Sequence, residues 1–138
     1  MQTMYRKVRA FLGEAYPPGS LFAAVHEFLR EKEPDVSKAT LIHLYRSLEQ
    51  HGRFLGNCPL ANVSLDLVHD FVEELRTRYS PGTIGPVVGD LKQFYAWAYH
   101  TGYTDGDYGR RLKKPRPVKG KHHAEEEDML MLIKFLAD

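Results

Sequence analysis

Cysteine is nearly absent from this chain of 138 residues, and long apolar runs are missing altogether. The one cysteine, Cys58, excludes an internal disulfide and has no second cysteine at the spacing of a metal site. No run approaches the roughly 18 consecutive apolar residues that cross a bilayer. The N-terminus also lacks the uninterrupted apolar segment of a signal peptide. We therefore expect a soluble, cytoplasmic protein with no membrane partner.

Sustained alternation of apolar and polar residues, the pattern of a half-buried strand, is missing as well. Apolar residues recur instead at helical spacing almost throughout, so the sequence predicts an all-α fold. With 43% hydrophobic residues, the chain has enough apolar material for one ordinary domain and no second large one.

Serine N-caps and glycine or proline stops predict where the helices begin and end. The expected helices cover residues 3–15, 20–31, 37–55, 64–77 and 83–102, and a last one with acids in its first turn covers residues 125–138. In the fifth helix Thr83 is the expected N-cap, because it leaves Pro86 in the first turn, where the missing N–H matters little. The alternative is Ser80 as N-cap with Pro81 at the first helical position.

Acidic residues are missing from residues 109–123, which hold seven lysines and arginines. The preceding 108 residues carry eleven basic against thirteen acidic residues, and residues 124–138 carry one lysine against five acids. The formal net charge of +1 therefore conceals a local cationic segment. Dense positive charge without nearby acids is typical of a segment that binds DNA phosphates. The alternative interpretation of this segment is a solvated, flexible tether. If most of the seven cations engage phosphate, we expect a log–log salt slope of about −6.

Catalytic and metal-binding patterns are missing too. The sequence has no set of nucleophile, base and orienting residue, and no glycine loop of the kind that cradles phosphates, so we expect neither an enzyme nor a small-molecule substrate. The adjacent His122 and His123 point in different directions and have no cysteine partner at ligand spacing. We therefore expect no metal and no cofactor.

Three aromatic residues near the end of the fifth helix, Tyr95, Trp97 and Tyr99, have the composition of a stacking platform for single-stranded nucleic acid. Their helix carries a regular apolar stripe, which favours packing in the core instead, at least for Tyr95 and Trp97.

Several motifs occur in an order that is similar to a known family. A Ser-x-x-Thr motif at residues 37–40 precedes "YRSLEQHGRFLG", and the serine-capped "VSLDLVHDFVEEL" follows. A second Ser-x-x-Thr motif, "SPGT", precedes "FYAWAYHTGY". The stretch "KKPRPVKGKHHAEEEDMLMLIKFL" follows, in which a basic run is succeeded by four acids and an apolar run. Over residues 20–138 the chain resembles the N-terminal core-binding domain of the tyrosine recombinase, or phage integrase, family. It departs from the family at "DGDYG", residues 105–109, where many members have Asn-Pro.

The resemblance implies a four-helix, SAM-like bundle over residues 20–107, preceded by a helical extension at residues 1–19. It also implies a basic linker over residues 108–124 and, over residues 125–138, the first helix of a catalytic domain that is otherwise missing. It further implies double-stranded DNA and other recombinase protomers as partners, in a prokaryotic, nucleoid-associated protein. The strand-cleaving residues of the family lie in the missing domain, so this fragment itself would not be catalytic.

The family places faces of the second and fourth bundle helices against the major groove. Carried over to this sequence, the expected DNA-binding residues in the bundle are Lys38, Thr40, His43, Arg46, Thr83 and Lys92. Those in the basic segment are Arg110, Arg111, Lys113, Lys114, Arg116 and Lys119. The pattern His-x-x-Arg at residues 43–46 has the form of a catalytic box of the family, but an accidental match is expected in a chain with seven histidines and ten arginines. The competing interpretation is a helical protein–protein interaction module with a basic tether.

Overall fold

Serine side chains cap three helices in the computed structural model, which describes residues 2–113. The hydroxyls of Ser20, Ser37 and Ser64 each accept a hydrogen bond from the backbone amide three residues later, at 3.1 to 3.3 Å. Each bond satisfies a donor that the first helical turn leaves unpaired, and such a cap is typically worth about 1 kcal/mol. The predicted starts of these three helices are therefore confirmed.

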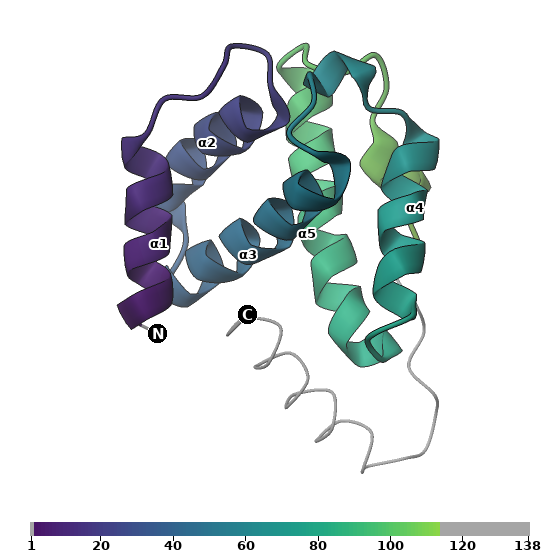
Figure 1. Cartoon of the computed structure of the whole chain (residues 1–138), viewed down its shortest axis with the longest axis horizontal. Helices are drawn as coiled ribbons and strands as arrows, with labels where there is room; N and C mark the ends of the chain where they lie inside the picture. The colour runs from purple at the N-terminus through teal and green to yellow at the C-terminus, as the bar shows by residue number, and fades with distance from the viewer. Residues whose placement is uncertain (1, 114–138) are drawn as a thin grey trace.

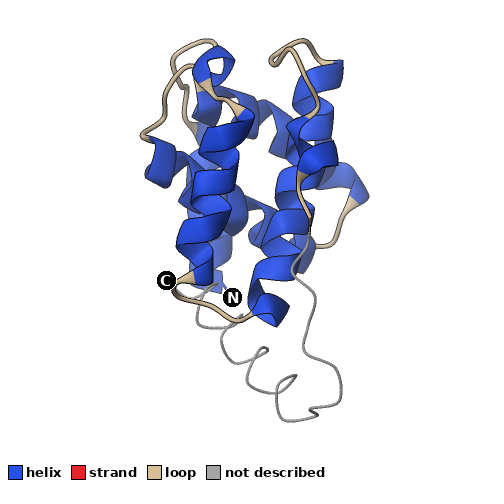
Figure 2. Cartoon of the chain, turned by 90° about the vertical axis from the view of Figure 1, so that its right-hand side faces the viewer, coloured by secondary structure: helices blue, strands red, loops and turns tan. Residues whose placement is uncertain are grey.

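The described part of the chain is helical and contains no strand (Figure 2). Its α-helices are α1 (Gln2–Gly13), α2 (Leu21–Lys32), α3 (Lys38–Leu55), α4 (Leu65–Arg76) and α5 (Pro81–His100). Three short 3₁₀ helices are η1 (Glu33–Asp35), η2 (Leu60–Asn62) and η3 (Tyr108–Arg111). This confirms the all-α prediction for residues 2–113.

Helix α3 occupies the centre of the arrangement and contacts each of the other four α-helices. In Figure 1, α1 stands at one end of the long axis, α4 and α5 run side by side at the other, and α3 crosses obliquely between them. The apolar faces of all five α-helices meet in one hydrophobic cluster. Phe28, Leu48 and Phe94, from three different helices, are fully buried in it.

The N-terminal helix belongs to this cluster. Met4, Val8, Phe11 and Leu12 of α1 are buried against α2 and α3. The sequence predicted a helical extension over residues 1–19, but in the structure α1 shares its core with the remaining helices.

The predicted start of α5 at Thr83 is wrong. Ser80 is the N-cap and Pro81 occupies the first helical position, while Pro86 lies inside the helix. A proline ring in an α-helix clashes with the N–H and Cβ of the residue before it and with the carbonyl four residues earlier. Residue 85 is a glycine, so the Cβ part of this clash is absent. Thr83 and Ile84 also donate to the Ser80 carbonyl at 3.1 Å, which holds the first turn in place ahead of Pro86.

The chain does not leave the bundle directly after α5. Gly102, with φ of +88°, reverses the chain in a Schellman turn, in which Tyr103 N–H donates to the Ala98 carbonyl at 2.8 Å. The following residues fold back onto α5, with Thr104, Gly109 and Leu112 buried. The linker predicted over residues 108–124 is therefore docked on the bundle, not free, at residues 108–112.

No helix among residues 2–113 has both the length and the apolar character needed to cross a membrane. The helix predicted over residues 125–138 lies outside the described residues.

Candidate nucleic-acid interface

The start of the basic segment has a fixed position on α5. Gly109 lies so close to this helix that a Cβ atom added to it would be 2.7 Å from the Lys92 carbonyl oxygen and 2.8 Å from Lys92 Cα. On one side of Gly109, the Tyr108 ring packs against the Tyr95 ring, with 5.6 Å between centroids. On the other side, Leu112 is 2% exposed. These contacts hold η3 on the bundle immediately where the cationic residues begin.

The first cations of the segment face solvent from this anchored position. Arg110, Arg111 and Lys113 are exposed, and Lys92, whose backbone Gly109 contacts, is half-buried. Three of the predicted DNA-binding residues therefore follow one another on the segment that is anchored to the Lys92 backbone. Lys114, Arg116 and Lys119 lie outside the described residues.

A second group of predicted residues lies at the start of α3, away from η3. Lys38 is exposed, and its ammonium group lies 4.0 Å from the centroid of the Tyr5 ring of α1. Thr40 is also exposed, and Ser37 Oγ donates to Thr40 Oγ1 at 3.0 Å. In Figure 1 this end of α3 lies beside α1, on the opposite side of the molecule from η3. The predicted residues therefore form two separate groups.

Arg46 and Thr83 do not lie on the surface. The Arg46 side chain is 2% exposed, and its Nη1 donates to Glu49 Oε2 at 2.5 Å. Thr83 is fully buried, and its hydroxyl lies 3.4 Å from that of Ser80. The expectation that these two residues face DNA fails for this conformation, because both face the bundle: Arg46 shares its side of α3 with core residues, and Thr83 packs in the first turn of α5.

His43 is tied to α5 by a polar network that the sequence interpretation missed. Its Nδ1 forms a hydrogen bond with Asp90 Oδ2, and Ser47 Oγ donates to the same oxygen at 2.7 Å. The His43 side chain is 18% exposed and that of Asp90 11%. His43 therefore connects α3 to α5, and this contact directs its ring inward.

The network lacks the arrangement of a nucleophilic triad. In such a triad the hydroxyl donates to the imidazole and the carboxylate orients the imidazole from behind. Here Ser47 donates to the carboxylate itself, so no base faces its oxygen. The arrangement joins two helices and supplies no activated nucleophile.

A second buried contact joins the same two helices. His51 Nε2 and the Tyr95 hydroxyl lie 2.6 Å apart, and both residues are fully buried. Burial lowers the pKa of His51 to about 3, because a charged imidazolium is unfavourable in an apolar surrounding. Burial also raises the pKa of the Tyr95 phenol.

A signal for these networks was present in the sequence. His43, Ser47 and His51 are spaced by four residues and so lie along one side of α3, next to its apolar stripe. A row of polar residues beside a core face indicates partners on a neighbouring helix.

The three aromatic residues near the end of α5, for which the sequence favours core packing over base stacking, differ in burial. Tyr95 is fully buried, and Trp97 is half-buried with its ring stacked on Tyr103 at 5.6 Å. Tyr99, in contrast, is 44% exposed. Core packing is thus confirmed for Tyr95, which is fully buried, and for Trp97, which packs against the core; Tyr99 is the most exposed of the three.

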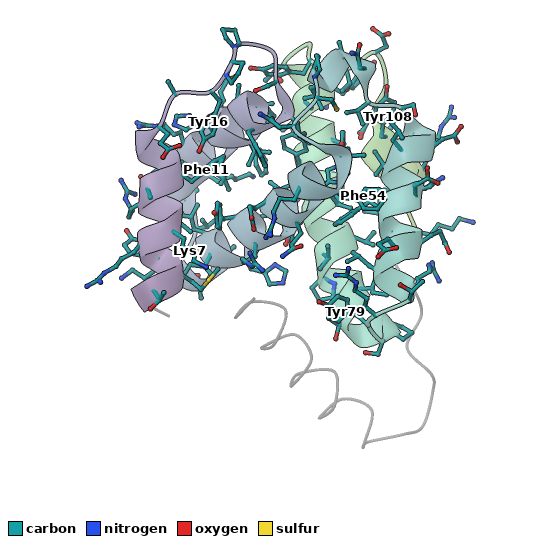
Figure 3. All side chains as sticks on the ribbon, viewed as in Figure 1. Lys7, Phe11, Tyr16, Phe54, Tyr79 and Tyr108 are labelled. Atoms are coloured by element: carbon teal, nitrogen blue, oxygen red, sulfur yellow. The ribbon has the colours of Figure 1, made fainter. Side chains whose placement is uncertain are left out.

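A hollow of about 380 Å³ lies beside the anchored cations, and Tyr99, Tyr108, Arg110 and Arg111 line it. Figure 3 labels Tyr108 near α4, on the side of the molecule opposite Lys7 of α1. Among residues 2–113 no group of three or more His, Cys, Asp and Glu side chains is placed to hold a metal ion. His122 and His123 lie outside the described residues.

Comparisons of this chain with known protein families, with curated proteins and with solved structures found no match.

Proposed function

We propose that this chain is a DNA-binding module of the core-binding, SAM-like type found in tyrosine recombinases. In this proposal it grips duplex DNA beside the site of strand exchange, together with other recombinase protomers on the same DNA. Strand breakage and rejoining belong to a catalytic domain outside these 138 residues.

The observation that carries the proposal is the anchored start of the basic segment. A flexible cationic tether would not need a fixed position on the bundle. Here, however, Gly109 and Leu112 hold the backbone against the bundle where the exposed Arg110, Arg111 and Lys113 begin. Four more lysines and arginines follow within residues 114–121, with no acid among them. Fixed cations lose less conformational freedom when they meet phosphate, and each neutralised phosphate releases counterions.

The helical bundle supports the same interpretation. Ser-x-x-Thr motifs begin both α3 and α5, and each opens a helix in the structure. Helix N-termini favour phosphate through free amide groups and the helix dipole. Lys38 and Thr40 at the start of α3 are exposed and provide a second, smaller contact region.

The test is a salt series of fluorescence-anisotropy titrations on duplex DNA. The wild-type chain should bind saturably at low salt, with a log–log slope of about −6. The double variant R110E/R111E should bind more weakly, with a slope smaller in magnitude by about 2, because each lost phosphate contact removes about one unit.

The matched control is R6E/K7E, which changes the net charge by the same amount on exposed positions of α1. These positions lie at the opposite end of the molecule from η3 (Figure 1). Because α1 lies beside Lys38 of the smaller contact region, the control should lose some affinity, but much less than R110E/R111E, and should keep most of the slope. Equal losses in the two variants would point to net charge alone. Absence of any binding at low salt would refute the proposal in favour of a helical protein–protein interaction module.

A further inference from the structure

The hollow beside η3 combines two features that are uncommon together on a protein surface. Its volume of about 380 Å³ falls within the range of small-ligand pockets, roughly 300 to 1,000 Å³. Its wall is formed by the start of α4, the end of α5 and the segment around η3, which contribute Leu65, Tyr99 and Tyr108 together with Asp107, Arg110 and Arg111.

The first feature is positive charge. Arg110 and Arg111 both line the hollow, and Asp107 is the one acidic residue in its wall. This carboxylate accepts a hydrogen bond from the Gly109 amide at 3.1 Å, where it caps η3. Guanidinium groups bind phosphate oxygens in a planar, two-pronged geometry, so this wall suits a phosphate group.

The second feature is an exposed aromatic ring. Tyr99 is 44% exposed, whereas Phe94 and Tyr95 before it in α5 are fully buried and Trp97 is half-buried. Every nucleobase has a face that stacks on an aromatic ring. In a paired duplex these faces are covered by neighbouring base pairs, so a ring next to phosphate-binding arginines fits a nucleotide whose base is unpaired.

We propose that this pocket takes one unpaired nucleotide of a DNA strand. Its phosphate is bound by Arg110 and Arg111, and its base stacks on Tyr99. The inference rests on the proposed function and extends it, because it predicts a preference among DNA structures where salt-dependent phosphate contacts alone predict none. The expected ligand is duplex DNA that carries a single-stranded end or a gap.

The test uses anisotropy titrations at one low salt concentration with two probes of equal charge, a fully paired duplex and a duplex with a short single-stranded overhang. The variants are Y99A, which removes the ring, and Y99F, which keeps it. The matched control is F54A, because Phe54 of α3 is also 44% exposed and is not part of the wall of the hollow. Circular dichroism establishes that each variant is folded.

The wild-type chain should bind the overhang probe about five- to tenfold more tightly than the paired duplex, as expected for stacking of one base. Y99A should lose this preference and keep its affinity for the paired duplex, while Y99F and F54A keep both. Equal affinity of the wild-type chain for the two probes overturns the inference and leaves the proposed function standing. A preference that survives in Y99A also overturns it, and failure to bind either probe overturns both proposals.

Discussion

Gly109 of η3 packs directly on the backbone of Lys92 in α5, so closely that no side chain fits between them. The two residues are separated by the end of α5, the turn at Gly102 and the loop that leads into η3. Their contact fixes the place on the bundle from which the basic segment starts. The positions of Arg110 and Arg111 therefore depend on how η3 packs against α5.

Replacing Gly109 by alanine should detach η3. The new Cβ would meet Lys92 backbone atoms at 2.7 and 2.8 Å, and the backbone of α5 cannot move aside as a flexible side chain can. Overpacking of this kind typically costs about 1–3 kcal/mol. In urea unfolding experiments G109A should unfold at lower denaturant, and the Leu112 amide, which donates to the Gly109 carbonyl at 3.2 Å, should exchange faster with solvent.

The control for this prediction is G106A in the same segment. A Cβ on Gly106 would lie 3.7 Å from a ring carbon of Tyr108, which is ordinary van der Waals contact. G106A should therefore unfold close to the wild-type midpoint. If G109A and G106A behave alike, η3 is not held by the Lys92 backbone.

Removing the Asp90 carboxylate should destabilise the junction of α3 and α5. D90A leaves His43 Nδ1 and Ser47 Oγ without their common acceptor in a largely buried location. An unsatisfied buried polar group costs about 1–3 kcal/mol, so we expect a loss of that order in the free energy of unfolding. D90N retains one oxygen acceptor and should lose less.

The exposed Asp70 of α4 provides the comparison, because D70A removes a carboxylate from a solvent-facing position. Its unfolding free energy should change by no more than about 0.5 kcal/mol. A D90A variant as stable as D70A would show that the network contributes nothing to stability.

The buried His51 predicts a specific loss of stability in acid. Burial lowers its pKa in the folded protein to about 3, below the value of 6.5 for an accessible histidine. Between these values the unfolded chain binds a proton that the folded chain does not, so stability falls as the pH drops below 6.5. At pH 5 the loss from this one group is about 2 kcal/mol relative to pH 7.

Urea unfolding at pH 7 and pH 5 measures this effect. H51Q removes the titrating group and should flatten the pH dependence, although its absolute stability falls with the loss of the Tyr95 contact. H69Q changes an exposed histidine of α4 and should keep the wild-type dependence. A pH dependence of the same size in H51Q as in H69Q would mean that other groups cause it.

How far the sequence predicts this structure depends on the range of the interactions involved. The caps at Ser20, Ser37 and Ser64 were predictable, because a serine hydroxyl and an amide three residues later form a local contact. The docking of η3 was not, because it depends on Gly109 meeting Lys92, and no local pattern in a stretch rich in glycine and charge indicates that contact.

The candidate site shows the same division. Arg110 and Arg111 are exposed, as is usual for arginine. Arg46 is buried, although an arginine is rarely enclosed by a core. Arg46 lies one helical turn after the buried Ile42 on the same side of α3, and its guanidinium pairs with Glu49, so its side chain is enclosed despite its residue type.

Local rules place the start of α5 too late because Gly85 lowers the cost of Pro86 inside the helix, and this cost is itself measurable. Pro86 is exposed, donates no hydrogen bond, and leaves the carbonyl four residues earlier without its helical partner. P86A should supply that donor and raise the helical propensity of α5. A proline in a helix interior costs about 3 kcal/mol, and the greater freedom of the unfolded P86A chain offsets about 1 kcal/mol, so a net gain of about 1–2 kcal/mol is expected.

P81A serves as the control, because Pro81 occupies the first helical position, where its fixed φ is favourable and its missing N–H has no helical acceptor. Urea unfolding should show P86A as more stable than the wild-type chain and P81A as no more stable. A destabilised P86A would mean that the proline fits α5 without cost and that its ring contributes to packing.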